Sequence, residues 1–316
     1  MNKKKGVLLV LGTAIISGIA IFINKFSLAT IDSSVFTFLK GVIVSVFLLS
    51  ILLAAREFKT IKTITKKQWV LLVLIGLIGG SIPFLLFFKG LALTSAASAA
   101  FMHKTLFIYA SLFAVVFLKE KINKKIFLAA ILLLVGNLLL LQLSSFTFGV
   151  GELLVLSAAI LWAGENVLSK HTLKKLSGNI VAFGRMFFGS LFILTFLIMT
   201  NKAALIPQIP LQGFLWTIIT SIVLLLFVTT YYNGLKHIKV SVATSILLLG
   251  SPITMLLSSL FLSATLAITQ LIGISLIALG IIATVLYIEL PKEKLQNLNC
   301  ISIMNTDRIS DRDTRN

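Results

Sequence analysis

The chain has 316 residues, of which 58% are hydrophobic and only 12% are charged. Soluble proteins are nearer to half apolar and a quarter charged, so a globular fold of this chain would expose apolar patches that soluble monomers avoid. The composition therefore excludes the soluble enzyme classes and indicates a protein that lies within a lipid bilayer.

The formal net charge of +18 would favour a nucleic-acid partner if the positive side chains lined one surface. Instead, most of the 28 Lys and Arg form short clusters between apolar runs, which is how membrane proteins set their orientation. We therefore expect no nucleic-acid partner. The single cysteine, Cys300, excludes a disulfide framework and a cysteine metal site, and we predict neither a metal nor another cofactor.

Ten apolar segments follow one another along the chain. Each can cross a hydrocarbon core of about 30 Å as a helix that rises about 1.5 Å per residue, and none alternates like a membrane β-barrel strand. We therefore predict an all-α integral membrane protein with ten transmembrane helices. The segments are 6–24, 34–55, 69–89, 95–118, 125–144, 150–170, 179–200, 213–233, 240–262 and 267–288.

The positive side chains between these segments are distributed asymmetrically. If the N-terminus is cytoplasmic, nearly all of them fall on the cytoplasmic side, and only Lys25, Lys89 and Lys202 fall on the other. Because positively charged loops stay in the cytoplasm, we predict a multi-pass protein of the cytoplasmic (plasma) membrane with both termini cytoplasmic.

A near-constant offset of 144 or 145 residues relates the two halves of the chain. It pairs Lys25 with Lys170, Lys40 with Arg185, and Phe87-Phe88 with Tyr231-Tyr232. Since five helices are an odd number, the second half enters the membrane inverted, as in many secondary transporters. We predict two inverted five-helix repeats at 1–145 and 146–290, followed at 291–316 by a polar cytoplasmic tail whose composition is typical of disorder.

Several local motifs carry a resemblance to a known family. They are Trp162-Ala163-Gly164-Glu165-Asn166, the basic residue shared by the second and seventh segments, Tyr232-Asn233-Gly234-Leu235, Ser251-Pro252 and Lys119-Glu120-Lys121. With the five-plus-five plan, the chain resembles the EamA-like branch of the drug/metabolite transporter superfamily over residues 6–288. The resemblance implies gradient-driven export or exchange of small metabolites through a cavity between the halves. Two positions depart from the repeat, because Ala264 corresponds to Glu120 and Ile108 to Pro252.

The sequence lacks the motifs of nucleotide-driven or enzymatic chemistry. It has no G-x-x-x-x-G-K-[ST] loop to hold phosphates and no G-x-S-x-G elbow. His103, His171 and His237 lie on different segments without the H-E-x-x-H spacing. We therefore expect the protein not to be an enzyme, and an intramembrane enzyme stays open as the alternative from another class.

Lys104 lies near the middle of the bilayer, about nine residues and hence about 14 Å into its segment. A charge there costs about 2.5–3.5 kcal/mol, so it normally faces a cavity or a partner. We predict that Lys104 binds an anionic group of the substrate, with His103 beside it. The alternatives are a carboxylate that neutralises Lys104 for structural reasons and a hydrogen-bonded core histidine.

Three further charged side chains lie inside the predicted helices. Glu165 and His103 are the candidates for coupling transport to protons, since both titrate and can be tuned by their surroundings; local pairing of Glu165 with Lys170 is the alternative. Lys40 and Arg185 lie at mirror-related depths and are candidates for substrate binding, or else for capping carbonyls or reaching headgroups.

Five aromatic and amide side chains complete the predicted substrate site: Tyr109, Trp162, Asn166, Tyr231 and Tyr232. Anchoring at the lipid interface is the alternative for each aromatic residue. The helices carry more positive than negative charge, so we predict a secondary transporter that moves a small metabolite with a carboxylate or phosphate, such as an amino acid or organic acid. We expect export by alternating access, with protons as a possible coupling ion. Export of neutral or cationic drugs stays open, and we predict no oligomeric state.

Overall fold

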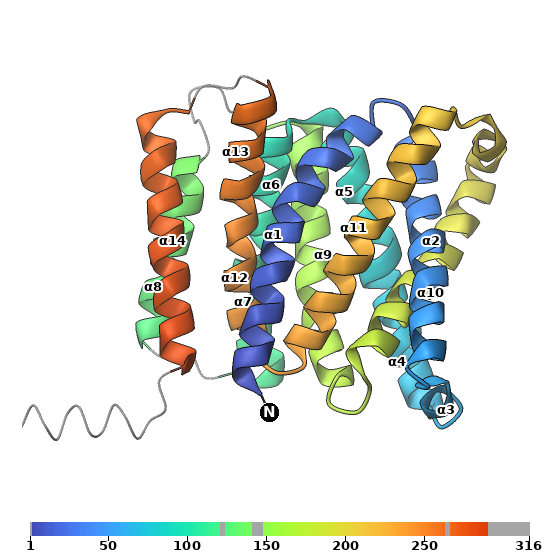
Figure 1. The fold of residues 1–316 in the computed structure, drawn as a ribbon, viewed down its shortest axis with the longest axis horizontal. Helices are drawn as coiled ribbons and strands as arrows, with labels where there is room; N and C mark the ends of the chain where they lie inside the picture. The colour runs from blue at the N-terminus through green and yellow to red at the C-terminus, as the bar shows by residue number, and fades with distance from the viewer. Residues whose placement is uncertain (1, 121–123, 141–147, 263–265, 290–316) are drawn as a thin grey trace, which may run out of the picture.

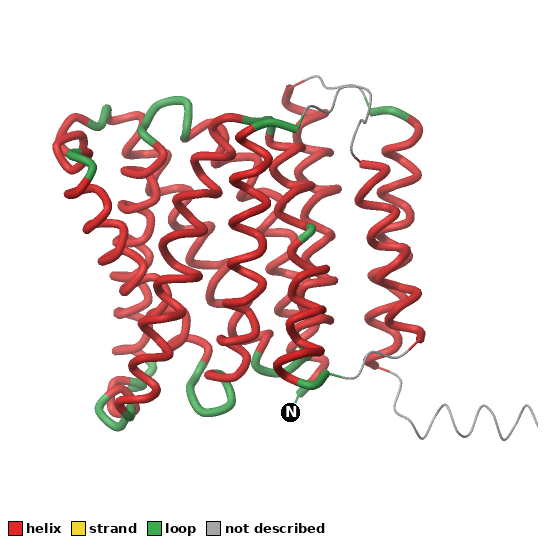
Figure 2. Tube along the Cα trace, turned by 180° about the vertical axis from the view of Figure 1, so that it is seen from behind, coloured by secondary structure: helices red, strands yellow, loops and turns green. Residues whose placement is uncertain are grey.

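The structure is a computed structural model that describes residues 2–120, 124–140, 148–262 and 266–289. These residues are helical apart from short connections, and they contain no strand (Figures 1 and 2). The predicted tail at 291–316 and the last part of the predicted segment 125–144 lie outside the described residues, as does Ala264.

The first half of the chain forms α1 (Lys3–Ser27), α2 (Ser33–Ala54), α3 (Phe58–Ile61), α4 (Lys66–Ile75), η1 (Gly76–Ser81), α5 (Ile82–Leu93), α6 (Ala96–Lys104), α7 (Leu106–Leu118) and α8 (Lys124–Leu140). The second half forms α9 (Val150–Thr172), α10 (Gly178–Met199), η2 (Lys202–Gln208), α11 (Leu211–Leu235), α12 (Val240–Ile246), η3 (Leu247–Leu249), α13 (Gly250–Leu262) and α14 (Ile268–Glu289).

Nine helical stretches among the described residues are long and apolar enough to cross a membrane. The tenth predicted span is represented by the shorter apolar helix Leu128–Leu140 within α8. The expectation of an all-α membrane protein built from two five-helix repeats is confirmed. In Figure 1, α8 and α14 stand together at one edge of the bundle, next to α13.

Three predicted spans are interrupted rather than continuous. The third consists of α4, the π-helical turn η1 and α5, the fourth breaks at Thr105 between α6 and α7, and the ninth contains the 3₁₀ turn η3. Pro252 supplies no N–H to the carbonyl of Leu248 in η3, which explains the tighter turn there. The breaks at Thr105 and Leu249 are one 144-residue offset apart, so the fourth and ninth spans bend at equivalent places.

The two halves interlock, and their contacts occur in matched pairs. α1 packs against α11 and α13, while its equivalent α9 packs against α5 and α7, the equivalents of those two helices. α2 packs against its own equivalent α10, and α8 against α14. The bundle is therefore stabilised mainly by contacts between the repeats rather than within them.

The repeat extends to individual hydrogen bonds of two lysines. Helices end with carbonyl groups that have no partner in the helix, and an ammonium group can donate three hydrogen bonds. Lys25 Nζ donates to the carbonyl oxygens of Leu91 (2.8 Å), Ala92 (3.2 Å) and Thr94, and Lys170 Nζ donates to those of Leu235 (2.7 Å), Lys236 (3.2 Å) and Ile238 (2.7 Å). The three acceptors in one half are offset by 144 residues from those in the other. Lys25 thus holds the end of α5, and Lys170 holds the end of α11.

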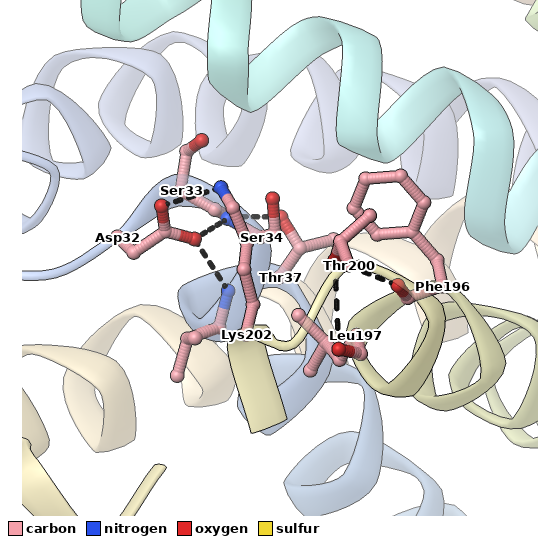
Figure 3. A network of polar contacts seen from close by, with 9 residues as sticks. Asp32, Ser33, Ser34, Thr37, Phe196, Leu197, Thr200 and Lys202 are labelled. Atoms are coloured by element: carbon pink, nitrogen blue, oxygen red, sulfur yellow. Dashed lines mark hydrogen bonds and ion pairs between the residues drawn. The ribbon is translucent and has the colours of Figure 1, made fainter. Parts of the chain in front are cut away.

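Asp32 is the N-cap of α2, which begins at the face of the bundle opposite the N-terminus (Figure 1), and Figure 3 shows its contacts. Its Oδ1 accepts the backbone N–H groups of Ser34 (2.8 Å) and Val35 (3.2 Å), and its Oδ2 lies 2.8 Å from Nζ of Lys202 in η2. Burial acts to raise the pKa of the Asp32 carboxyl, but Lys202 and the two N–H groups outweigh burial and hold this pKa below its ordinary value. Asp32 therefore joins the start of α2 to η2.

Candidate functional site

A cavity of about 80 Å³ lies inside the bundle. Its walls come from α1, α2, α5, α6, α7, α9, α10, α11 and η3, so both halves contribute. This volume holds a few water molecules or a small chemical group. The polar side chains that line it are Ser17, Asn24, Lys40, His103, Trp162, Glu165, Asn166, Arg185 and Tyr231.

One wall of the cavity is aromatic. Phe84, Phe87 and Phe88 of α5 line it together because positions i, i+3 and i+4 lie on one face of a helix. The Phe84 ring meets the edge of Trp162 at 5.2 Å between centroids, and the His103 ring lies 5.1 Å from Trp162 and 5.4 Å from Phe87. These phenylalanines were not among the predicted site residues, although their spacing was a usable signal.

Lys40 of α2 lines the cavity and is 2% exposed. Its Nζ donates to Asn24 Oδ1 at 2.7 Å and lies 4.8 Å from the ring centroids of both Phe36 and Phe88. Aromatic faces attract a cation, but none of these three groups carries a negative charge. Among the described residues, no carboxylate lies within ion-pair distance of Lys40.

Tyr232 links the buried base Arg185 to the buried acid Glu165. Arg185 Nη1 donates to the Tyr232 hydroxyl at 3.0 Å, and that hydroxyl donates to Glu165 Oε1 at 2.6 Å. The Ser169 hydroxyl donates to the same carboxylate oxygen. Arg185, Glu165 and Tyr232 are each less than 5% exposed. Charge-assisted hydrogen bonds of this kind make it possible to bury both charges.

Two cavity side chains donate to a single backbone oxygen. Trp162 Nε1 lies 2.8 Å and Arg185 Nη2 lies 3.0 Å from the carbonyl oxygen of Gly79 in η1. Nearby, the Tyr231 hydroxyl donates to Asn166 Oδ1 at 2.7 Å. The α9 side chains of the cavity are therefore held by η1 on one side and by α11 on the other.

Seven of the predicted site residues line the cavity: Lys40, His103, Trp162, Glu165, Asn166, Arg185 and Tyr231. Three do not. Lys104 lies behind the wall, where its Nζ donates to the Ser17 hydroxyl at 2.7 Å and where Gly250 leaves room for it. Tyr232 lies behind Arg185 and Glu165, and Tyr109 is half-buried against the hydrophobic core.

Two polar atoms of the cavity residues are buried and have no partner among the described residues. They are His103 Nδ1 and Arg185 Nε. The Arg185 Nε–H is a donor in every state of the side chain, so it can serve an acceptor on a bound molecule. The described residues contain no group of three or more His, Cys, Asp or Glu that could hold a metal ion.

Asn24 and Ser169 were missed by the sequence analysis, although the repeat offset signals them. The offset of 145 residues pairs Asn24 with Ser169 just as it pairs Lys40 with Arg185. Asn24 accepts a hydrogen bond from Lys40 directly. Ser169 donates to Glu165, which is linked to Arg185 through the Tyr232 hydroxyl. Two uncharged polar side chains at offset-related positions, each near a buried charged residue, are therefore a further signal for this site.

Comparison with known proteins gives one family. The model of the EamA-like transporter family matches the chain twice, over residues 4–142 and 149–286. An uncharacterized transporter of Bacillus subtilis (strain 168), YyaM, is 22% identical over 303 residues, which cover 93% of this chain and 98% of that protein. A second uncharacterized transporter, from the cobO 3′ region of Sinorhizobium sp, is 30% identical over 116 residues, or 37% of this chain and 82% of that protein. One solved crystal structure with 17% sequence identity has the same fold, with a TM-score of 0.72 over 90% of this chain and 97% of the other.

Proposed function

The chain belongs to the EamA-like transporter family, and from this premise we propose that it exports a small metabolite bearing a carboxylate or a phosphate. Membership of this family makes the protein a multi-pass membrane transporter of small molecules. The chemical class of the substrate and the direction of transport are our proposal, and we expect no enzymatic turnover.

The charge of the cavity supports this substrate class. Lys40 and Arg185 line the cavity with a single acid, Glu165, and Lys104 adds a further buried cation behind Ser17. Glu165 is bound to Arg185 through Tyr232, whereas Lys40 and Lys104 contact neutral oxygens. Because an uncompensated buried charge is costly, an anionic group that enters the cavity is stabilised. This surplus of positive charge is the observation that carries the proposal.

The proposed mechanism is alternating access between the two interlocked repeats, with the cavity at their interface. We propose the cytoplasmic membrane as the location and the cytoplasm for both termini, on the distribution of the positive loops. Glu165 and His103 are the proposed proton-coupling groups. A proton on Glu165 would remove the charge that the Tyr232 and Ser169 hydroxyls now stabilise, and this change would reach Arg185 through Tyr232.

A transporter of neutral or cationic drugs is the second candidate, and the aromatic wall favours it. Phe84, Phe87 and Trp162 offer apolar faces that would accept an aromatic or cationic molecule. The three buried basic side chains of this region oppose a cationic substrate, since like charges repel strongly where water is excluded.

Uptake into proteoliposomes under an imposed pH gradient separates these candidates. The purified protein should transport carboxylates or phosphate esters, and the Lys40→Gln variant should transport them with lower affinity. Matched uncharged analogues of the same substrates serve as controls. Transport of cationic dyes without transport of any anion would contradict the proposed substrate class, and turnover in detergent without a gradient would support an enzyme instead.

A further inference from the structure

The third span contains a carbonyl group whose α-helical donor is missing. In an α-helix the carbonyl of Gly79 accepts the N–H of residue 83, but residue 83 is proline and has no N–H. The preceding turn, η1, is π-helical, and the N–H of Ile82 accordingly reaches back to the carbonyl of Leu77. Pro83 therefore removes the α-helical donor of the Gly79 carbonyl, and other donors can take its place.

The donors that use this carbonyl are both cavity residues of the second half. Trp162 Nε1 lies 2.8 Å and Arg185 Nη2 lies 3.0 Å from the Gly79 oxygen. Each side chain is at most 5% exposed. A buried carbonyl has two lone pairs, so the two donors satisfy it fully.

Close approach of the helices makes these hydrogen bonds possible. A Cβ on Gly79 would lie 2.4 Å from Cγ of Glu165, and a Cβ on Gly80 would lie 2.0 Å from the carbonyl oxygen of Arg185. Real Cβ atoms do not come this near to other atoms, so only glycine allows α9 and α10 to pack against η1 here. Gly79 and Gly80 thus bring the cavity side chains within reach of the free carbonyl.

The second half does not repeat this arrangement. The 144-residue offset pairs Gly79 with Val223 and Pro83 with Phe227, and the corresponding helix, α11, runs without a break from Leu211 to Leu235. The five-helix repeat therefore forms without a π-helical turn. The turn in the first half is a local feature of the cavity and not a requirement of the fold.

We propose that the Gly79 carbonyl, freed by Pro83, is the positioning group that orients Arg185 and Trp162 toward the substrate. With Nη1 bound to Tyr232 and Nη2 bound to Gly79, the guanidinium group is held at two points, and Nε is the donor left without a partner. Pro83 is accordingly a positioning residue. The effect that we expect on transport rests on the function proposed above. The effect that we expect on the Trp162 hydrogen bond is independent of that function.

The test is Pro83→Ala, which restores an N–H that can claim the Gly79 carbonyl. We expect the apparent affinity for the anionic substrate to fall about ten-fold, as for loss of one hydrogen bond to a charged group, with little change in the maximal rate. The second readout is the indole ¹⁵N–¹H resonance of Trp162 in a Trp69→Phe, Trp216→Phe background. We expect that resonance to shift to the position of a weakly bonded indole. Pro252→Ala is the matched control, because it also removes a helix-interrupting proline but should leave the Trp162 resonance unchanged.

An unchanged Trp162 resonance in a folded Pro83→Ala protein would overturn the proposal. If that variant does not fold, Pro83→Gly restores the same N–H in a more permissive backbone and answers the same question. A shifted resonance with no change in substrate affinity would support the hydrogen bond between Gly79 and Trp162. It would overturn the role of this hydrogen bond in positioning side chains for transport. If the wild-type protein transports no anion, the proposed function fails, and the resonance alone then decides whether Gly79 holds Trp162.

Discussion

Buried cations of this protein are bound mainly by neutral oxygens. Lys40 is bound by the amide of Asn24, Lys104 by the hydroxyl of Ser17, and Arg185 by a backbone carbonyl and a tyrosine hydroxyl. Neutral partners satisfy donors without cancelling charge. The interior of the bundle therefore keeps a positive character that a mobile anion can complement.

Lys104→Met should weaken substrate binding without preventing folding. A direct charge-assisted contact is worth about 1.5–3 kcal/mol, or roughly ten- to a hundred-fold in affinity, and this range is the upper bound for a lysine that lies behind the cavity wall. Lys104 does not line the cavity itself, so we expect its effect to pass through the Ser17 hydroxyl, and Ser17→Ala should give a smaller loss. The concentration dependence of transport measures both variants.

The control for this prediction is Lys104→Arg, which keeps the charge. A planar guanidinium does not replace a compact ammonium, so recovery should be partial. Lys104→Met with unchanged affinity would reduce Lys104 to a structural residue.

Glu165→Gln should remove the dependence of transport on an imposed proton gradient. The amide oxygen can still accept the hydrogen bond from Tyr232, so the network is kept while the titratable group is lost. His103→Ala tests the second candidate, whose ring lines the cavity between Phe87 and Trp162. Transport rates measured across a range of pH distinguish the two groups, and coupling lies elsewhere if neither variant changes the profile.

The burial of the charged cavity side chains could be predicted from the sequence, but their rotation about the helix could not. Counting along a helix placed Lys40, Arg185 and Glu165 inside the membrane, and each lines the cavity. Tyr231 and Tyr232 have nearly the same depth, yet they differ by about 100° around α11, and only Tyr231 lines the cavity. Which helix each side chain faces depends on packing between the repeats, which a single sequence does not contain.

At the scale of elements, the apolar runs predicted the spans but not the breaks in them. Hydropathy reports only the length of a run, and α4, η1 and α5 together form one continuous run. The break is caused by Pro83 and by the donors that capture the Gly79 carbonyl, and two of those groups belong to other helices. A proline alone signals that a break can occur, whereas the partner helices determine its geometry.

Asp32→Ala should destabilise the start of α2, and Asp32→Asn should destabilise it less. Both variants lose the ion pair with Lys202, which is worth little because both side chains are about a third exposed. Only the alanine variant also loses the N-cap hydrogen bonds to Ser34 and Val35, at a cost of about 1 kcal/mol. Melting temperatures in detergent measure the difference, and equal values for the two variants would contradict a capping role.

The same carboxyl should make stability depend on pH in the acidic range. Its folded-state pKa lies below its ordinary value, so its contribution is fully present above that ordinary value, at about pH 4. It is lost as the pH falls through the lower folded-state pKa. In Asp32→Asn this part of the acid-induced loss of stability should be absent.

Lys25→Met and Lys170→Met should destabilise the protein to a similar degree. Each substitution strips three backbone carbonyls of their donor at equivalent helix ends, and leaving partly buried acceptors without partners is costly. Lys89→Met is the matched control, because Lys89 is exposed in α5. Melting temperatures of the three variants check the prediction. A lower melting temperature in only one of the Lys25→Met and Lys170→Met variants would argue against equivalent roles.

At the scale of the whole molecule, the matched packing of the halves follows from the internal repeat. Once α1 and α9 are equivalent and inverted, a contact of α1 with α11 requires a contact of α9 with α5, and both are present. The all-α architecture was therefore accessible from the sequence. The asymmetries between the halves were less accessible, because Glu165, Pro83 and Gly79 each lack a like residue at the equivalent position. Glu165 lines the cavity, and the Gly79 carbonyl binds two of its side chains.

The orientation of the bundle can be tested by labelling single cysteines from outside the cell. In a Cys300→Ser background, Lys62→Cys lies between α3 and α4, and Lys202→Cys lies at the start of η2, on the opposite face of the bundle (Figure 1). Because the loops on the face of Lys62 carry most of the positive charge, we expect a membrane-impermeant maleimide to label residue 202 in intact cells and residue 62 only after permeabilisation. A reporter fused after Asn316 should be cytoplasmic. Labelling of both positions in intact cells would contradict the ten-span topology, whereas labelling of residue 62 alone would keep the topology and reverse its orientation.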